Sequence, residues 1–316
     1  MNFFHPKKLQ LTAIYFSMTV FILIFISCIL HILWNISGKK CKDNEAFTWL
    51  TTFGGAVFCI IAMLISRLIT KNPFPPAGFF TMAAASGFFE TTYFIFLFWS
   101  YKHIDMSASY PLGRGLAPVI TLFLVPISSM IFDIKGHGSL RLEQLPAVIT
   151  TLAGAMLICR DSWKRSTQKQ NAVKGLTLAC LTGLSIAGYH LVDSQTLEKY
   201  TQVSEIEYLG FVFIFMLLFA SIWFFPKKNA IPRIKEEWKS CYMGVLSVSF
   251  VAQANYMIVL YAFSIAKNPT LVTAARNMGI VLSLVVCAIR LKEKITPMKA
   301  VGAALITAGI IWIFLV

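Results

Sequence analysis

The chain has 316 residues, of which 57% are hydrophobic and only 13% are charged, and its formal net charge is +14. A soluble domain carries about 25% charged residues, so this composition excludes an ordinary soluble protein and predicts a polytopic membrane protein. The excess of Lys and Arg does not indicate nucleic-acid binding. These residues occupy short linkers between apolar runs, where they would meet lipid headgroups.

Ten apolar runs follow one another along the chain, each close to the roughly 20 residues that a helix needs to cross a bilayer. The first run is too long for the hydrophobic core of a signal peptide and lacks a small-residue cleavage site. The linkers are short and polar, with Pro and Gly as helix-stopping signals. The sequence therefore predicts an all-α fold with ten transmembrane helices, over residues 13–36, 46–69, 78–101, 107–132, 142–160, 173–196, 205–225, 240–264, 269–290 and 297–316.

The longest basic linker, residues 160–174, divides these ten spans into five and five. We expect two repeats, over residues 1–167 and 168–316. Because five is odd, the second copy must enter the membrane upside down. Inverted five-helix repeats are typical of transporters whose site lies near the bilayer midplane between the repeats.

Two arginines inside apolar runs are the strongest local signal. Arg114 lies in the fourth span and Arg276 at the matching place in the ninth. A charge at membrane depth costs roughly 3 kcal/mol on insertion scales, and it marks a functional site by default. The alternatives are arginines that lock helices through backbone carbonyls, or that extend their side chains to the membrane surface. The helix around Arg114 carries four hinge candidates, Pro111, Gly113, Gly115 and Pro118.

Counting residues from the span ends places other polar side chains at depths similar to those of the arginines. A rise of about 1.5 Å per residue puts each arginine about 10 Å deep, from opposite faces of a core about 30 Å thick. The two predicted clusters are His31, Asn35 and Arg114 near one face, and Tyr189, Asp193 and Arg276 near the other.

Further polar residues lie in the middle of other spans. Glu90 is the candidate for proton coupling, since desolvation raises the pKa of a carboxylate; the alternative is a carboxylate neutralised by an arginine. Gln253 and Asn255 are candidates for lining a cavity, with interhelical hydrogen bonding as the alternative. His190 is expected to face away from the site and to be structural.

The sequence gives no sign of a metal or cofactor. The seven cysteines form no C-x-x-C pair and mostly lie within apolar runs, which favours buried free thiols over disulfides or a metal site. No Walker-type glycine loop is present, so ATP is not expected to drive the protein directly.

Three stretches carry a family resemblance. They are His31-x-x-Trp34-Asn35, the segment Tyr110–Pro118, and the closing stretch Pro269–Ile313. In these the chain resembles the EamA branch of the drug/metabolite transporter (DMT) superfamily. The resemblance implies ten helices in two inverted repeats, and export or exchange of small metabolites. Asn277 follows Arg276 where relatives often carry a carboxylate.

The orientation in the membrane stays open. Loops after odd-numbered spans hold 18 Lys and Arg and the other side holds 8; with Arg114 and Arg276 these make up the total of 28. The positive-inside rule then favours both termini outside, whereas the resemblance implies cytoplasmic termini.

These features together predict a non-enzymatic secondary transporter in the cell (inner) membrane, a monomer or homodimer without cofactor. It would export or exchange a small polar metabolite, an amino acid or organic anion, with protons as the candidate coupling ion. One alternative is a flippase for a lipid-linked sugar. Another is an intramembrane enzyme, which would need four groups close together, whereas the predicted placement divides them between the two faces: His31, His190, Glu90 and Asp193.

Overall fold

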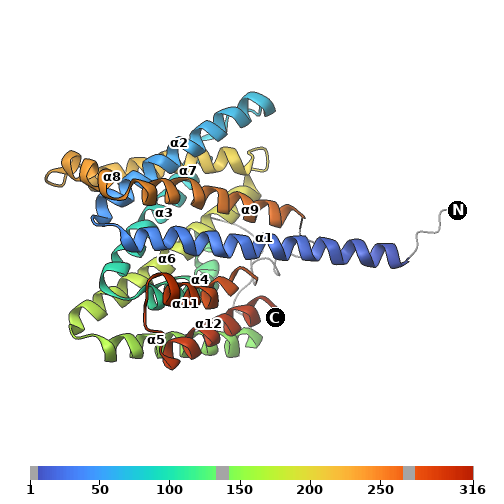
Figure 1. Cartoon of the computed structure of the whole chain (residues 1–316). Helices are drawn as coiled ribbons and strands as arrows, with labels where there is room; N and C mark the ends of the chain where they lie inside the picture. The colour runs from blue at the N-terminus through green and yellow to red at the C-terminus, as the bar shows by residue number, and fades with distance from the viewer. Residues whose placement is uncertain (1–5, 133–141, 266–274, 316) are drawn as a thin grey trace.

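The computed structural model describes residues 6–132, 142–265 and 275–315, and this part of the chain contains helices and no strand (Figure 1). The start of the predicted ninth span, residues 269–274, lies outside the described residues. The long helices are α1 (Pro6–Lys40), α2 (Asn44–Thr70), α3 (Ala77–His103), α4 (Met106–Phe132), α5 (Leu145–Arg165), α6 (Lys169–Lys199), α7 (Glu205–Phe224), α8 (Ala230–Leu246), α9 (Ala252–Ile265), α11 (Met278–Arg290) and α12 (Pro297–Leu315).

Seven stretches of the described chain are long and apolar enough to cross a membrane, the first being Met18–Lys40 and the last Ala230–Val259. Two shorter apolar helices, Met278–Arg290 and Pro297–Ile313, follow them. The protein is therefore a multi-pass membrane protein. The N-terminal end of α1 and the C-terminal end of α12 point to the same side of the bundle (Figure 1).

Helix α3 is long enough to span but is not among those seven, because Glu90 and many small polar residues lower its hydropathy. It packs against α6 and α7 in the interior of the bundle. Helices that face lipid behave in the opposite way: α2 leaves Phe53, Val57 and Ile61 exposed along one side, as expected where the solvent is hydrocarbon.

The eighth span departs from the sequence prediction. Its helix begins at Ala230, ten residues earlier than expected. Residues 230–239 form an amphipathic first part of the helix, and their charged residues lower the hydropathy on which the prediction was based. The backbone kinks at Cys241 (φ −143°, ψ 28°), and a π-helical turn, Ser247–Val251, leads into α9. Such turns often occur at functional sites.

Helices α5 and α12 approach each other through glycines. A Cβ atom on Gly302 would lie 2.8 Å from the carbonyl oxygen of Gly154, and one on Gly154 would lie 2.5 Å from the carbonyl oxygen of Gly302. A Cβ on Gly309 would lie 2.7 Å from the carbonyl oxygen of Ala147. Close helix contact at Gly302 and Gly309 agrees with the expectation that small residues let membrane helices approach closely.

Candidate functional site

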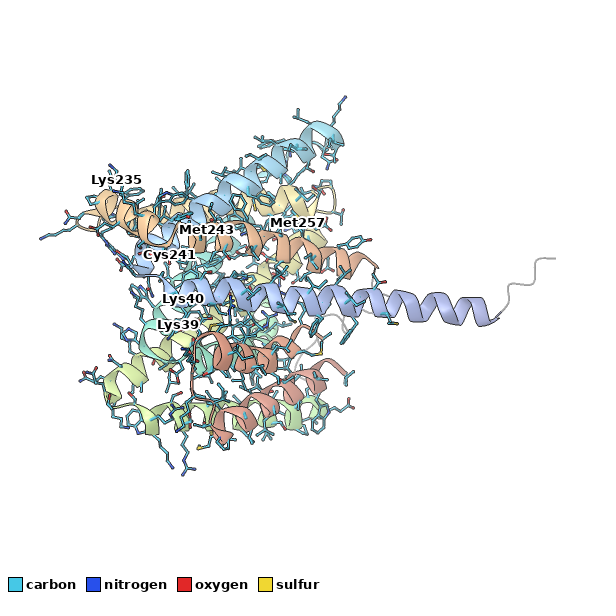
Figure 2. All side chains as sticks on the ribbon, viewed as in Figure 1. Lys39, Lys40, Lys235, Cys241, Met243 and Met257 are labelled. Carbon is cyan, nitrogen blue, oxygen red and sulfur yellow. The ribbon has the colours of Figure 1, made fainter. Side chains whose placement is uncertain are left out.

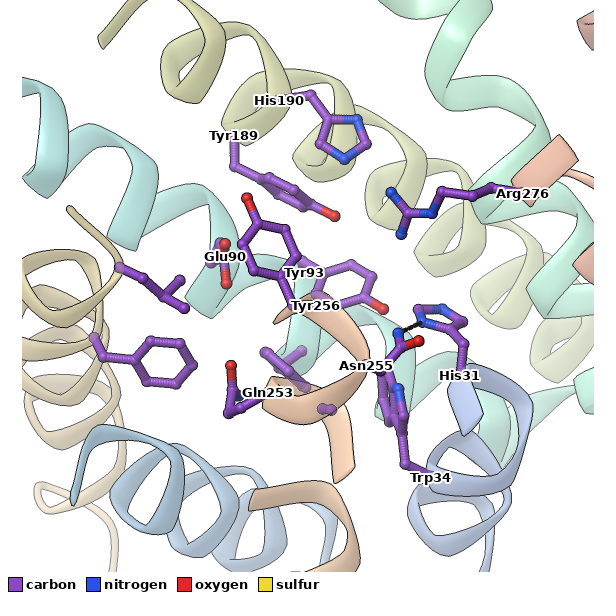
Figure 3. A pocket seen from close by; sticks show the side chains of 14 residues that line it. His31, Trp34, Glu90, Tyr93, Tyr189, His190, Gln253, Asn255, Tyr256 and Arg276 are labelled. Carbon is purple, nitrogen blue, oxygen red and sulfur yellow. Dashed lines mark hydrogen bonds between the residues drawn. The ribbon is translucent and has the colours of Figure 1, made fainter. Parts of the chain in front are cut away.

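A partly open cavity of about 80 Å³ lies between helices from both halves of the chain (Figure 3). That volume exceeds the space of a single water several times. The lining combines aromatic, amide, imidazole and charged side chains with few aliphatic ones. It comprises His31, Trp34, Glu90, Tyr93, Phe94, Tyr189, His190, Leu209, Phe213, Ala252, Gln253, Asn255, Tyr256 and Arg276.

Helical spacing explains why these residues share one surface. On α3 the lining residues are Glu90, Tyr93 and Phe94, at positions i, i+3 and i+4, which lie on one face of a helix. Helix α9 repeats this spacing from Ala252, and α1 contributes a pair three residues apart, His31 and Trp34. One face of each helix is thus turned to the cavity.

The structure brings together residues that the sequence analysis had separated. His31 and Arg276, predicted near opposite faces, line the same cavity, and so do Glu90 and His190. The expectation that His190 faces away from the site was therefore wrong. The error came from placing residues by depth alone, without the direction in which each side chain leaves its helix. The argument that distance separates His31, His190 and Glu90 no longer counts against an enzyme.

Arg114 contacts the cavity wall through His31. Its Nη1 lies 3.1 Å from His31 Nε2. Arginine is always protonated and donates, so His31 Nε2 must accept, and the ring carries its proton on Nδ1. The amide nitrogen of Asn255 lies 3.4 Å from that Nδ1, while the buried Asn255 Oδ1 has no hydrogen-bond partner within the described residues. Exchanging the oxygen and nitrogen positions of the Asn255 amide places Oδ1 beside His31 Nδ1–H. The N–H group then has an acceptor, and Oδ1 has a donor.

His31 is consequently held as a neutral, oriented ring between Arg114 and Asn255. Trp34 packs against it edge-on, with ring centroids 4.9 Å apart. Protonation at Nε2 would set two cationic donors against each other at Arg114. This geometry favours an orienting role for His31 over that of a proton relay.

Asn35 does not line the cavity. Its Nδ2 donates to the carbonyl oxygen of His31 at 2.6 Å, and its Oδ1 accepts a hydrogen bond from Tyr101 at 2.6 Å. Tyr101 is only 2% exposed. This buried pair ties α1 to α3 just below the cavity.

Asp193 takes hydrogen bonds from neighbouring helices. Its Oδ1 accepts from Ser86 at 2.5 Å and from Tyr208 at 2.6 Å. It also lies close enough to Glu90 for the two carboxylates to repel each other. Among the described residues, Asp193 makes no hydrogen bond or ion pair with Arg276, so the predicted Tyr189/Asp193/Arg276 cluster is not assembled as expected.

Helix α4 runs unbroken through Pro111, Gly113, Gly115 and Pro118. Two of these hinge candidates have a clear packing role. A Cβ on Gly113 would lie 3.1 Å from Thr182 of α6, and one on Gly115 would lie 2.3 Å from Ile306 of α12. A hinge at this segment stays a prediction.

At one end of the bundle, polar contacts join the two halves of the chain. Arg233 donates to Asp43 at 2.6 and 2.8 Å and to Glu45 at 2.7 Å, and Lys227 donates to Glu45 at 2.6 Å. Glu237 accepts from the backbone N–H groups of residues 42 and 43. We call Asp43, Glu45, Lys227, Arg233 and Glu237 the inter-half network.

A second set of contacts at the same end follows the same plan. The Glu293 carboxylate accepts from the backbone N–H groups of Met106 and Ser107, at the start of α4, at 2.9 and 2.8 Å. Lys299 donates to Asp105 at 2.6 Å. Figure 2 shows Lys39, Lys40 and Lys235 gathered at this end, opposite the N-terminal end of α1. Loops of both halves are thus fastened together on one side.

The network gives the protein a defined acid sensitivity. Burial opposes ionisation of Asp43, but hydrogen bonds from Arg233 and from the N–H groups of Ala46 and Glu45 outweigh it and lower the pKa of Asp43 below its usual 3.8. A lowered pKa adds stability above the unfolded pKa, and this stability is lost as the pH falls through the folded value. We expect thermal stability in detergent to fall below about pH 4, and to fall less in Asp43→Asn. Equal losses in both proteins would contradict this.

Among the described residues, no group of three or more His, Cys, Asp and Glu side chains is arranged to hold a metal ion. The site is instead a cavity in a helical membrane bundle, lined by charged and aromatic groups from helices far apart in the sequence. Fold and site together define a polytopic membrane protein with a polar interior cavity.

Comparison with known proteins gives the family. The model of the EamA-like transporter family matches residues 173–315. These residues match that family, which confirms the resemblance there. The match and the helical membrane fold together support a membrane transporter of the DMT type. A solved structure titled "Crystal structure of protein" matches with a TM-score of 0.56 and 15% identity, covering 93% of this chain and 97% of that one. This likeness concerns the fold. No curated protein matches the chain.

Proposed function

We propose that the protein is a secondary transporter that moves a small polar metabolite, an amino acid or organic anion, by alternating access. The observation that carries this proposal is the cavity itself. It lies between helices of both halves and holds a carboxylate, Glu90, and a guanidinium, Arg276. Charged groups at membrane depth are costly, and they mark substrate or ion pathways.

The helix contacts support two inverted repeats, residues 1–167 and 168–316. If the halves are equivalent, α1 to α5 correspond in order to α6, α7, α8 with α9, α11 and α12. The contacts α2–α7 and α5–α12 then join equivalent helices. The contacts α3–α6 and α4–α6 have counterparts in α9–α1 and α11–α1. Such reciprocity is expected when a pseudo-two-fold axis relates two repeats.

The inter-half network supports alternating access. A transporter that opens to one side at a time needs contacts that close the other side and can separate. The network and the Glu293 and Lys299 contacts join the halves at one end by charge-assisted hydrogen bonds between side chains and loops. We propose that these contacts close the cavity at this end and separate when it opens.

The direction and driving force belong to the same proposal. Export or exchange across the cell (inner) membrane is what the family suggests. Glu90 is the group we propose for proton coupling, since it is the carboxylate that faces the cavity. Accumulation of substrate driven by an imposed pH gradient, and lost on adding a protonophore, would support coupling.

The proposal is tested by counterflow in proteoliposomes with a panel of amino acids, organic anions and sugars. Truncating one partner of a buried charge pair costs about 2–5 kcal/mol, or roughly 30-fold or more in affinity. We expect Arg276→Ala to lose exchange of the accepted solute. Arg114→Ala should also weaken it, since Arg114 orients His31.

Arg160→Ala is the matched control, because Arg160 is exposed near the C-terminal end of α5 and has no ion pair among the described residues. Exchange that survives Arg276→Ala would demote this arginine to a structural role. No exchange of any solute by the unaltered protein would contradict the proposal and favour the lipid-linked sugar, which calls for a flippase assay.

A further inference from the structure

Two charged groups of the cavity have no hydrogen-bond or ion-pair partner in the described part of the chain. Among the described residues, neither the Glu90 carboxylate nor the Arg276 guanidinium makes a side-chain hydrogen bond or an ion pair, although both line the cavity. Other charges at this depth make at least one side-chain hydrogen bond: Ser86 and Tyr208 donate to Asp193. Arg114 donates to His31 through Nη1, although its buried Nε has no partner among the described residues. The two unpaired groups are therefore exceptions within the same interior.

Leaving such groups unpaired is expensive. The effective penalty of desolvating an ion in a protein is several kcal/mol, and it is offset only by a counter-charge with good geometry. Glu90 and Arg276 do not offset each other, since no ion pair joins them. Figure 3 shows them on opposite sides of the cavity, with the rings of Tyr93 and Tyr256 between them. A ligand must then satisfy each group separately.

The aromatic wall suits a ligand with a cationic end. The rings of Tyr93 and Tyr189 pack with centroids 5.9 Å apart beside Glu90. Ring faces attract ammonium groups and can add to the pairing with a carboxylate. At the other side, Arg276 offers donors in a planar fork that matches a carboxylate or phosphate.

We propose that the cavity binds a zwitterion whose ammonium group pairs with Glu90 and whose acid group pairs with Arg276. The two charges of this ligand lie at separate ends of a short chain or ring, and not on one carbon atom. A plain organic anion would leave Glu90 unpaired, and a neutral sugar would leave both groups unpaired. This inference rests on the proposed transport function and names the substrate class of the same cavity.

The first experiment needs no mutation. The purified protein is melted in detergent with 4-aminobutyrate, 5-aminovalerate or 6-aminohexanoate, with the acid or amine that lacks the other charge, and with α-amino acids of equal length. A ligand that binds only the folded state raises the melting temperature. We expect at least one separated zwitterion to bind tighter than either singly charged analogue by about tenfold or more, as loss of a charge-assisted bond implies.

The second experiment crosses ligands with variants. In Glu90→Gln, the zwitterion should no longer bind tighter than the acid that lacks the amine. In Arg276→Gln, the zwitterion should no longer bind tighter than the amine that lacks the acid group. Glu236→Gln and Arg160→Gln change exposed positions. In these two variants the zwitterion should still bind tighter than either singly charged analogue. Removing an unpaired charge should not impair folding, which the melting temperatures without ligand check directly.

The outcomes separate this inference from the proposed function. If the unaltered protein exchanges organic anions as well as it exchanges zwitterions, the zwitterion inference is overturned and transport stands. If α-amino acids bind better than every separated zwitterion, the separation of charges is overturned. If no solute is exchanged or bound, the proposed function itself fails.

Discussion

Replacing Gly302 with leucine should prevent the protein from being purified as a stable, folded species. A Cβ atom there would lie 2.8 Å from the Gly154 carbonyl oxygen and 2.8 Å from Ile158 Cγ1. Backbone cannot move aside as the end of a flexible side chain can, so α12 must separate from α5. Overpacking typically costs 1–3 kcal/mol and occasionally more, and we expect at least about 3 kcal/mol here. The measurement is thermal unfolding with size-exclusion chromatography in detergent.

The control for this substitution is its neighbour in the sequence. Val301 is 51% exposed on the outer side of α12, so Val301→Leu adds bulk where lipid can accommodate it. The two variants should differ sharply, and Val301→Leu should unfold at a temperature close to that of the unaltered protein. If Gly302→Leu also unfolds at that temperature, the close contact of α5 and α12 does not hold the fold together.

Replacing Arg233 with alanine should open the end of the bundle that the inter-half network closes. Arg233 makes three hydrogen bonds to Asp43 and Glu45, and hydrogen bonds to charged groups contribute about 1.5–3 kcal/mol. Losing this residue should shift the population of the open form by roughly tenfold or more. The reactivity of Cys41 reports the population of the open form. This side chain is 6% exposed and lies in the loop between α1 and α2, next to the network.

Cys41 is protected in two ways while this end is closed. Its Sγ donates to the carbonyl oxygen of Gly38 and to Asn44 Oδ1. Burial, followed by the charge of Glu237, raises the pKa of the Cys41 thiol, and the thiolate is the reactive form. Alkylation of Cys41, followed by mass spectrometry to resolve it from the other thiols, should therefore be faster in Arg233→Ala.

Lys228 supplies the comparison for that experiment. It lies next to Lys227 in the sequence but has no ion pair among the described residues, so Lys228→Ala removes a nearby positive charge without breaking the network. Its rate of Cys41 alkylation should match that of the unaltered protein. Equal rates in Arg233→Ala and Lys228→Ala would mean that the network does not hold this end closed.

The helices could largely be predicted from hydropathy, because a bilayer demands long apolar runs and the linkers interrupt them with charge. The prediction failed where a helix does not need to be apolar. Residues 230–239 are helical but carry several charges, and hydropathy responds to solvent preference, not to backbone conformation. Helix α3 fell below the apolar criterion for the related reason that it carries part of the polar interior.

The cavity could be predicted only in part. Charge inside apolar runs pointed to Glu90, Arg114 and Arg276, and the structure places the first and last in one cavity. Depth alone could not place Asn35, whose side chain turns to Tyr101. The contributions of Leu209 and Phe213 had no signal at all, since α7 is apolar on every side and nothing in its sequence marks the inward face.

The π-helical turn at Ser247–Val251 has a consequence for the face that α9 presents. An α-helix advances by about 100° per residue, and a π turn adds about one residue to its turn. Everything after it is therefore rotated relative to the helix before it. Tyr242 and Met243 before the turn are exposed, whereas Gln253 and Tyr256 beyond it line the cavity. The turn thus acts as a phase shift within one span, so that one part of it presents exposed side chains to the outside of the bundle and the next part lines the polar cavity.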